Sequence, residues 1–325
     1  IQQEKLNNQV AELDVATSEN NIQESIAQVY IQILYAAESV KVNESTLQVS
    51  IAQRDRGQEL LNAGSIAKSD FAQLEAQVST DRYQLVTAQA TLEDYKLQLK
   101  QLLELDGENE MNIYLPALSD ENVLAPLPTK KDVYIRALSL RPEIEASKLN
   151  VEASELGIGI AKSSYLPTIS LSAGIGTNHT SGSDFTFGEQ VKNGWNNSIG
   201  LSVSVPIFNN RQTKSAVQKA KLQYETSMLS LLDEQKTLYK TIEGLWLDAN
   251  SAQQRYAAAN EKLKSTQISY ELISEQFNLG MKNTIELLTE KNNLLQAQQE
   301  QLQAKYMAIL NMQLLKFYQG DQLAI

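Results

Sequence analysis

The sequence contains no cysteine, and this absence excludes several kinds of site. A chain without thiols has no disulfide framework, zinc ribbon, iron–sulfur cluster or thiol nucleophile. Its single histidine, His179, cannot build a multi-histidine metal centre, and a serine–histidine–aspartate triad would depend on that one position. The acidic residues are scattered on helices at surface spacing. We therefore expect no enzymatic activity, no metal and no cofactor.

Basic residues are in the minority, and long apolar runs are missing. The formal net charge of −11 argues against a nucleic-acid partner, because phosphate-binding surfaces need clustered lysine and arginine. No apolar run approaches eighteen residues, which excludes a transmembrane helix. Residue 1 is isoleucine, and residues 1–20 are polar and helix-like rather than a signal peptide. A water-soluble helical protein and an outer-membrane barrel remain.

Proline and glycine are scarce outside the middle of the chain. All six prolines lie between Pro116 and Pro206, and eight of the fourteen glycines lie between Gly157 and Gly200. Since these residues interrupt regular helices, the chain divides into two helical arms and an irregular, partly β centre.

The arms carry apolar residues at helical spacing over long distances. Residues 1–63 predict a helix of roughly 95 Å, and residues 210–279 predict one of about 105 Å, at about 1.5 Å per residue. Helices of this length need lateral partners, as in a coiled coil or a helical tube.

Each long helix ends at a glycine and is followed by a second helix. Gly64 precedes a predicted helix over 70–105, and Gly280 precedes one over 286–318, so both arms read as αα-hairpins. Superposing the two glycines also pairs Glu59 with Glu275 and other residues far upstream. We interpret the hairpins as copies within an internal two-fold repeat.

The centre begins with a proline-containing linker over residues 105–128. Thr129 and Asp132 fit a capping box ahead of a short helix, and Pro142 suits the first turn of a second helix that runs to about Ser164.

Two segments, 167–177 and 197–207, then alternate apolar residues with Ser, Thr and Gly. This period-two pattern predicts strands, and about ten residues suit a tilted strand that crosses a bilayer. A soluble hairpin packed on helices is the alternative, but the polar face carries no charge, which favours a crowded lumen. The residues predicted to face lipid are Ile169, Leu171, Ala173, Ile175, Ile199, Leu201, Val203 and Val205.

Three segments in order, 141–144, 164–171 and 200–208, resemble the outer-membrane efflux proteins of the TolC type. The segments read Arg-Pro-Glu-Ile, Ser-Tyr-Leu-Pro-Thr-Ile-Ser-Leu and Gly-Leu-Ser-Val-Ser-Val-Pro-Ile-Phe. The paired hairpins also match the internal repeat of that family, so the resemblance extends over essentially the whole chain.

The resemblance implies a mainly α fold with a membrane β hairpin. Three chains would form a homotrimer that shares an α-barrel of long αα-hairpins across the periplasm and a β-barrel in outer-membrane lipid. It implies a channel that docks on a periplasmic adaptor protein and an inner-membrane pump, for tripartite efflux or type I secretion. The exported substrate is not specified, because substrate choice lies largely in the pump.

The resemblance also divides the chain into five segments. They are a long helical hairpin over 1–104, the linker over 105–128, a short helix and a second helix over 129–166, the strand hairpin with its extracellular loop over 167–207, and a second long hairpin over 208–325. A complete family member has two strand hairpins. By the repeat offset, we expect about 87 further residues before Ile1, so that this chain supplies half of the barrel strands. A lipid-anchored cysteine in that part is left open.

The family places the hairpin tips, marked by Gly64 and Gly280, at the closed periplasmic entrance. Counting along the chain from these glycines gives Asp70, Lys282 and Glu286 as candidate gate residues. The alternative is structural, because Asn283 and Glu286 fit a capping box and acids stabilise the first turn of a helix.

Two other protein classes share some of these features. A flagellin-like filament protein is also acidic, cysteine-free and helical at both ends, but the duplicated glycine turns argue against it. A periplasmic adaptor, or membrane fusion protein, carries a long hairpin too, but it should show lipoyl-like halves and several short strands.

Overall fold

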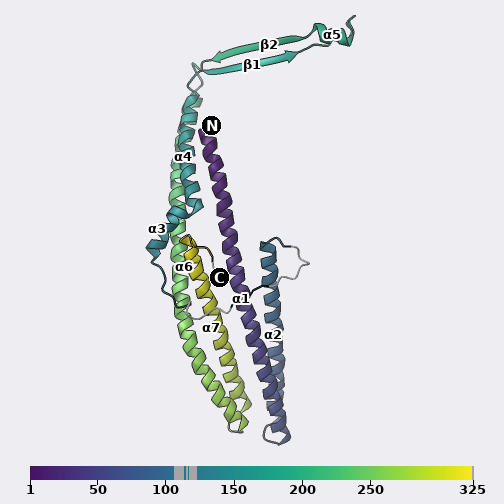
Figure 1. Ribbon diagram of the computed structural model, residues 1–325, viewed down its shortest axis with the longest axis vertical. Helices are drawn as coiled ribbons and strands as arrows, with labels where there is room; N and C mark the ends of the chain where they lie inside the picture. Colours follow the sequence, from purple (N-terminus) through teal and green to yellow (C-terminus); the bar gives the residue numbers. More distant parts are fainter. Residues whose placement is uncertain (106–112, 115, 117–122, 324–325) are drawn as a thin grey trace. The chain divides into compact units, whose positions relative to one another are not determined.

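The computed structural model describes residues 1–105, 113–114, 116 and 123–323 (Figure 1). The mainly helical class expected from the sequence is confirmed. Much of the predicted linker falls outside the described residues. In chain order the elements are α1 (Gln2–Asn62), α2 (Lys68–Leu102), α3 (Lys130–Leu140), α4 (Pro142–Ser163), β1 (Thr168–Gly176), α5 (Phe187–Asn193), β2 (Asn196–Ser204), α6 (Gln212–Asn278) and α7 (Thr284–Tyr318).

The chain forms two compact units, and several helices continue from one into the other. The strand unit contains residues 1–12 and 145–233, and the helical unit contains residues 13–144 and 234–325. The candidate gate residues all belong to the helical unit, and the predicted lipid-facing residues all belong to the strand unit.

Two antiparallel hairpins build the helical unit, one from α1 and α2 and one from α6 and α7 (Figure 1). Their apolar stripes meet where α1 packs against α6 and α7, as amphipathic helices require. Ile31 and Leu34 of α1 lie there against Tyr256 of α6 and against Tyr306 and Leu310 of α7. Helix α7 of the second hairpin therefore packs against α1 of the first hairpin.

The short helix α3 packs against the last turns of α7. The hydroxyl of Thr129 accepts a hydrogen bond from the N–H of Asp132 at 3.2 Å, which satisfies a free donor of the first turn. Val133 and Ala137 are fully buried, in a cluster that includes Leu315 of α7.

In the strand unit, β1 and β2 pair antiparallel, with Leu171 opposite Leu201 and Ser172 opposite Gly200. Directly opposite residues share a face, so this register gathers the apolar residues of both strands on one face, with Asn197 beside Ile175 at its end, and Ser, Thr, Gly and Asn196 on the other. The strands are slightly shorter than the predicted segments, and Val205 lies just beyond β2.

A helix that the sequence pattern did not predict lies between the strands. Helix α5 begins after Thr186, whose hydroxyl accepts from the N–H of Glu189, while the Glu189 carboxylate accepts from the N–H of Thr186 at 3.0 Å. This capping box is readable from the sequence, but Gly188 and Gly194 make the segment look like a loop. Within the described residues, no helix has both the length and the apolar character needed to cross a bilayer.

Candidate functional site

Each hairpin of the helical unit turns at a glycine in the left-handed region. Gly64 follows α1 and Gly280 follows α6, and both have a φ of 72°. Each glycine N–H donates to the carbonyl three residues back, and the next N–H donates to the carbonyl five residues back. This Schellman arrangement needs a residue with positive φ, which strains any residue that has a Cβ. The two turns are therefore built in the same way.

Asp70 and Glu286 occupy equivalent places, at the third position of the helix that follows each turn. Asp70 Oδ2 accepts from the N–H of Ala67 at 3.3 Å, and Glu286 Oε2 accepts from the N–H of Asn283 at 3.2 Å. Both carboxylates thus cap the first turn, where N–H groups lack helical partners and the helix dipole favours negative charge.

Lys282 pairs with Glu286 on its own hairpin, with its Nζ 2.5 Å from Oε1. The hydrogen bond from Lys282, together with that from the N–H of Asn283, lowers the pKa of the Glu286 carboxyl below its ordinary value. Within the described chain, no hydrogen bond or ion pair joins Asp70 to either residue. All three gate candidates lie at the tips, and the structure brings two of them into contact.

Apolar packing joins the two hairpins beside the tips. Leu74 of α2, Phe277 of α6 and Leu287 of α7 form a cluster in which no side chain is more than 2% exposed. Fully burying a side chain of this size contributes about 1.5–3 kcal/mol. The contribution of Phe277 to the tip is apolar.

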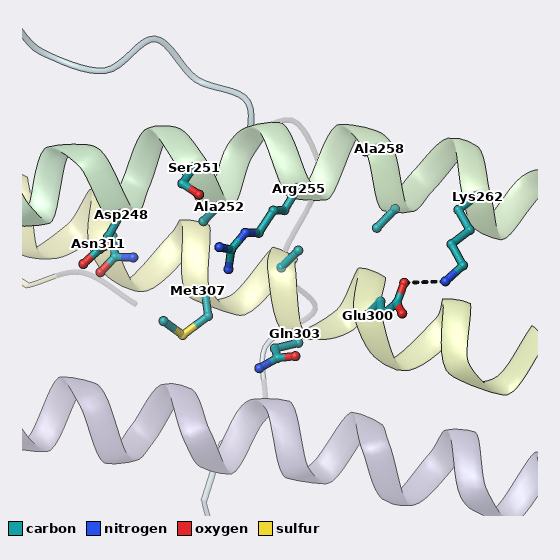
Figure 2. Close-up of a pocket in the computed structure, with 12 residues that line it drawn as sticks. Asp248, Ser251, Ala252, Arg255, Ala258, Lys262, Glu300, Gln303, Met307 and Asn311 are labelled. Carbon is teal, nitrogen blue, oxygen red and sulfur yellow. Dashed lines mark hydrogen bonds and ion pairs between the residues drawn. The ribbon is translucent and has the colours of Figure 1, made fainter.

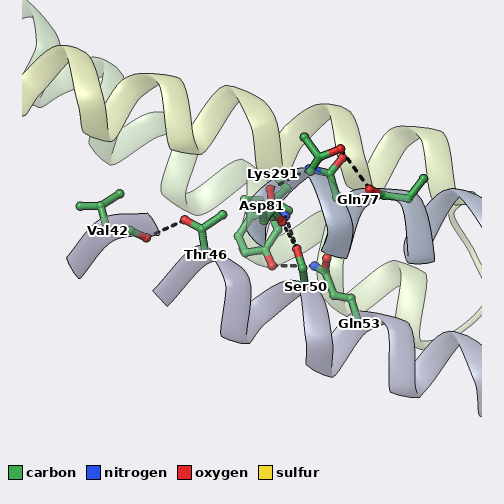
Figure 3. A network of polar contacts seen from close by, with 10 residues as sticks. Val42, Thr46, Ser50, Gln53, Gln77, Asp81 and Lys291 are labelled. Atoms are coloured by element: carbon green, nitrogen blue, oxygen red, sulfur yellow. Dashed lines mark hydrogen bonds and ion pairs between the residues drawn. The ribbon is translucent and has the colours of Figure 1, made fainter. Parts of the chain in front are cut away.

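Further from the tips, a buried polar network joins three helices (Figure 3). Lys291 of α7 forms an ion pair with Asp81 of α2, and both contact the hydroxyl of Ser50 on α1. Gln77 Nε2 donates to the other oxygen of Asp81 at 2.9 Å. Ser50, Asp81 and Lys291, the inter-hairpin triad, are each at most 3% exposed. Burial lowers the pKa of Lys291, and Asp81 opposes that effect.

We did not predict this triad from the sequence, although the helical spacing places Asp81 and Lys291 at core positions of their helices. Asp81 continues the apolar stripe of Leu74 and Val78, and Lys291 follows Leu287 by one turn. Charged residues at core positions of an amphipathic helix are rarely buried without a partner. The pairing itself depends on how the two hairpins pack, which the spacing does not give.

Two further polar contacts connect α1 with the second hairpin. Gln53 Nε2 donates to the hydroxyl of Tyr270 at 2.7 Å, and Arg56 Nη2 donates to the carbonyl of Asn278 at 3.3 Å. Together with the inter-hairpin triad and the apolar cluster, these two contacts hold the hairpins together in the part near Gly64 and Gly280.

A second buried charge cluster lies at the other end of α7. Arg141, 6% exposed, donates through Nε to Glu143 at 2.7 Å and through Nη2 to Glu24 of α1 at 3.4 Å. Its guanidinium lies 4.4 Å from the ring centre of Tyr318. Burial raises the pKa of Glu24 above its ordinary value and that of Tyr318 to about 12. This cluster ties the junction of α3 and α4 to α1 and α7.

An open groove of about 510 Å³ runs between α6 and α7 (Figure 2). Met307 and several alanines line it, together with Asp248, Arg255 and the ion pair of Lys262 with Glu300. Because both signs of charge are present, the groove offers no excess of one charge for an ion. Among the described residues, no group of three acidic or histidine side chains is arranged to hold a metal.

The apolar face of the strand pair is exposed in the chain. Leu171, Ile199 and Leu201 are 70–83% exposed. Monomeric soluble proteins rarely expose a continuous apolar face of this kind, which marks a surface that contacts protein or membrane.

Long helical hairpins joined to a strand pair with one apolar face define the fold of outer-membrane channel subunits. The channel CmeC from Campylobacter jejuni has this fold, with a TM-score of 0.79 and 19% identity over 100% of this chain and 68% of that channel. The chain belongs to the outer membrane efflux protein family, whose model matches residues 133–320, more than half of its length.

Two relatives are similar along most of the chain. The outer membrane efflux protein BepC from Brucella suis is 24% identical over 89% of this chain, and the outer membrane protein TolC from Escherichia coli is 23% identical over 93%. The chain spans 60% of the length of the first and 62% of the second. Neither name is that of an enzyme. As a family member, the chain is an outer membrane protein.

Proposed function

We propose that the chain is a subunit of a trimeric channel that crosses the outer membrane and extends through the periplasm, without enzymatic activity. The channel would serve as the exit duct for tripartite efflux or type I secretion. The observation that carries this proposal is the strand pair, with one apolar face and one uncharged polar face. Lipid would contact the first face and the aqueous lumen the second.

The unpaired edges of this strand pair support a closed β-barrel in the proposed channel. A strand edge in lipid leaves backbone N–H and C=O groups without partners, at a cost of several kcal/mol each. Strands from symmetry-related chains would pair with these edges and close the sheet. Three chains would also align their long hairpins side by side as an α-barrel.

An internal repeat is supported by the two hairpins. Helices α2 and α7 have 35 residues each, and the turns before them share the same φ and the same hydrogen-bond pattern. The acid that caps each of these helices is also at the same position. We infer that the hairpins are copies and that their tips form the periplasmic entrance.

Glu286, Lys282 and Asp70 would line this entrance. A threefold ring of Glu286 carboxylates would favour cations, because its field concentrates ions of opposite charge. Within one chain, the hydrogen bonds from Lys282 and from the N–H of Asn283 lower the pKa of Glu286, whereas neighbouring carboxylates in a ring would raise it.

The test is planar-bilayer conductance of the full-length protein and its Glu286→Gln variant. We expect the variant to lose part of the cation preference and the block by a trivalent cation. A matched control is Glu300→Gln, which removes a carboxylate of α7 that also pairs with a lysine, Lys262, at 2.7 Å. Unchanged selectivity in Glu286→Gln would leave that residue only its capping role.

The partners implied by this function are a periplasmic adaptor protein and an inner-membrane pump. Extraction of the natural full-length protein separates the proposal from its rivals. A trimer that requires detergent supports the channel. A soluble polymer would indicate a filament protein, and a soluble monomer with a long hairpin would indicate an adaptor.

A further inference from the structure

Basic residues gather where the helices of the strand unit meet the strands. The segments 156–166 and 205–224 contain no aspartate or glutamate, although acidic residues outnumber basic ones by 39 to 28 in the whole chain. The same two segments hold five basic residues, which we name the basic collar: Lys162, Arg211, Lys214, Lys219 and Lys221. The net charge of −11 therefore conceals a local excess of positive charge.

The register of the strands places both segments at the same end of the strand pair. Thr168, the first residue of β1, lies opposite Ser204, the last residue of β2. Helix α4 ends a few residues before Thr168, and α6 begins a few residues after Ser204. The acidic residues Asp184 and Glu189 lie between β1 and β2, and so at the opposite end. The basic collar is thus confined to the end from which the helices leave the strands.

The five side chains of the basic collar are exposed in the chain. The packed side of the first turns of α6 is formed instead by Thr213 and Val217, which are 5% and 9% exposed. Within the described part of the chain, none of the five forms an ion pair, unlike Lys148 of α4, which pairs with Glu145. The charges of the collar are therefore available to a partner outside the chain.

Exposed apolar side chains separate the basic collar from the strands. Tyr165 and Leu166 precede β1, Ile207 and Phe208 follow β2, and all four are 55–96% exposed. Along both connections the order is therefore an apolar strand face, then exposed apolar or aromatic side chains, then basic side chains. A chain that leaves a bilayer meets hydrocarbon, interface and headgroups in the same order, and aromatic and basic side chains favour the last two.

We infer that the basic collar binds the headgroups of anionic phospholipids at the periplasmic surface of the outer membrane. This inference rests on the proposed channel function, which puts the strands in lipid and the helices in the periplasm. Each basic residue close to an anionic bilayer strengthens binding about fivefold. Three chains would repeat the collar around the barrel.

The contribution of each basic residue should depend on its distance from the strands. Lys162 lies in the last turn of α4 and Lys214 in the first turn of α6, next to the strand connections. Lys221 lies about 13 Å beyond the start of α6 at about 1.5 Å per residue. Because salt screens exposed charges over about 8–10 Å, Lys221 should contribute less than the other two.

The test compares lipid binding by the full-length wild-type trimer and by the triple variant Lys162→Gln, Lys214→Gln and Lys219→Gln. Trimers stripped of lipid in a neutral detergent are titrated with phosphatidylglycerol or with phosphatidylcholine of the same chain length, and native mass spectrometry counts the bound lipids. We expect the wild type to bind phosphatidylglycerol at least about tenfold more tightly than phosphatidylcholine, and the triple variant to lose at least about fivefold of this preference. Raising the salt concentration should weaken the preference of the wild type.

Two control variants separate a local charge effect from a general one. Lys236→Gln, Lys240→Gln and Lys264→Gln together remove the same charge from exposed positions of α6, about 35 Å or more beyond its start, and should keep the preference. Replacing the three collar lysines by arginine should also keep it, because a headgroup phosphate accepts hydrogen bonds from either cation. The salt dependence needs only the wild type, so the inference stays testable if a variant does not assemble.

Several results would overturn the inference. They are equal binding of the two lipids by the wild type, a wild-type preference in the triple variant, and displacement of phosphatidylglycerol by inorganic phosphate at the same concentration. An altered ion selectivity in planar bilayers with an unaltered lipid preference would place the collar in the lumen, which also contradicts the inference. If the wild type forms no conducting trimers, the proposed function is wrong; if its trimers conduct without a lipid preference, only the lipid-binding collar is wrong.

Discussion

Replacing Arg141 by leucine should destabilise the helical unit through two carboxylates that it leaves behind. The guanidinium is 6% exposed and contacts both Glu24 and Glu143. Breaking a buried ion pair by removing one partner costs about 3–5 kcal/mol. We expect a loss of this size in the free energy of unfolding at pH 8. Arg141→Lys should lose less, because it keeps the charge but not the contacts of a planar guanidinium.

The pH dependence of the stability loss in Arg141→Leu identifies the cause of that loss. Burial raises the pKa of Glu24 above its ordinary value of 4.5 even with Arg141 present, and removing the arginine should raise it further. A carboxyl whose pKa is higher in the folded state stabilises that state below its unfolded pKa, and this contribution is lost as the pH rises through the folded value. The deficit of Arg141→Leu should therefore shrink from pH 8 to pH 5.

The assay is thermal unfolding of the full-length protein followed by circular dichroism between pH 5 and pH 8. Lys148→Leu is the control, because its ion pair with Glu145 is exposed and should contribute about 0–1 kcal/mol. If Arg141→Leu is as stable as the wild type, or if its deficit grows at low pH, the reasoning about buried carboxylates is wrong.

Three further changes test separate parts of the fold. Gly64→Ala and Gly280→Ala should each lower the free energy of unfolding by about 1–2 kcal/mol in chemical denaturation, because both positions have positive φ. A new Cβ would meet no other atom, so the loss would come from the backbone conformation alone. Unchanged denaturation midpoints would contradict this. Leu287→Ala, at a position with no exposed surface, should cost about 2–5 kcal/mol in the same assay, and a smaller loss would mean that the tip cluster collapses around the cavity. Leu201→Lys on the apolar strand face should cost about 2–4 kcal/mol and lower trimer insertion, whereas Ser202→Lys on the opposite face should insert and alter ion selectivity; equal effects would refute the assignment of faces.

The helices could be predicted from the sequence because their signals are local. Apolar periodicity, Gly64 and Gly280 as stops, and caps such as Thr129 all act within a few residues. Helix α5 was missed because its cap, Thr186, lies in a short segment with two glycines, where the propensity for helix is weak.

Contacts between the hairpins could not be predicted in the same way. The spacing after each turn located Asp70 and Glu286, and the capping box of Glu286 could be predicted from its local sequence, whereas the cap that Asp70 forms was not predicted. The triad depends on the register of α7 against α2, which is set by packing. Such tertiary contacts involve residues more than two hundred positions apart, so no local pattern contains them.

Planar-bilayer recording of the natural full-length protein, purified in detergent, tests the central claim most directly. We expect trimers that insert and conduct, with a cation preference that falls in Glu286→Gln. A protein that stays soluble without detergent, or that inserts no conducting trimers, would contradict it.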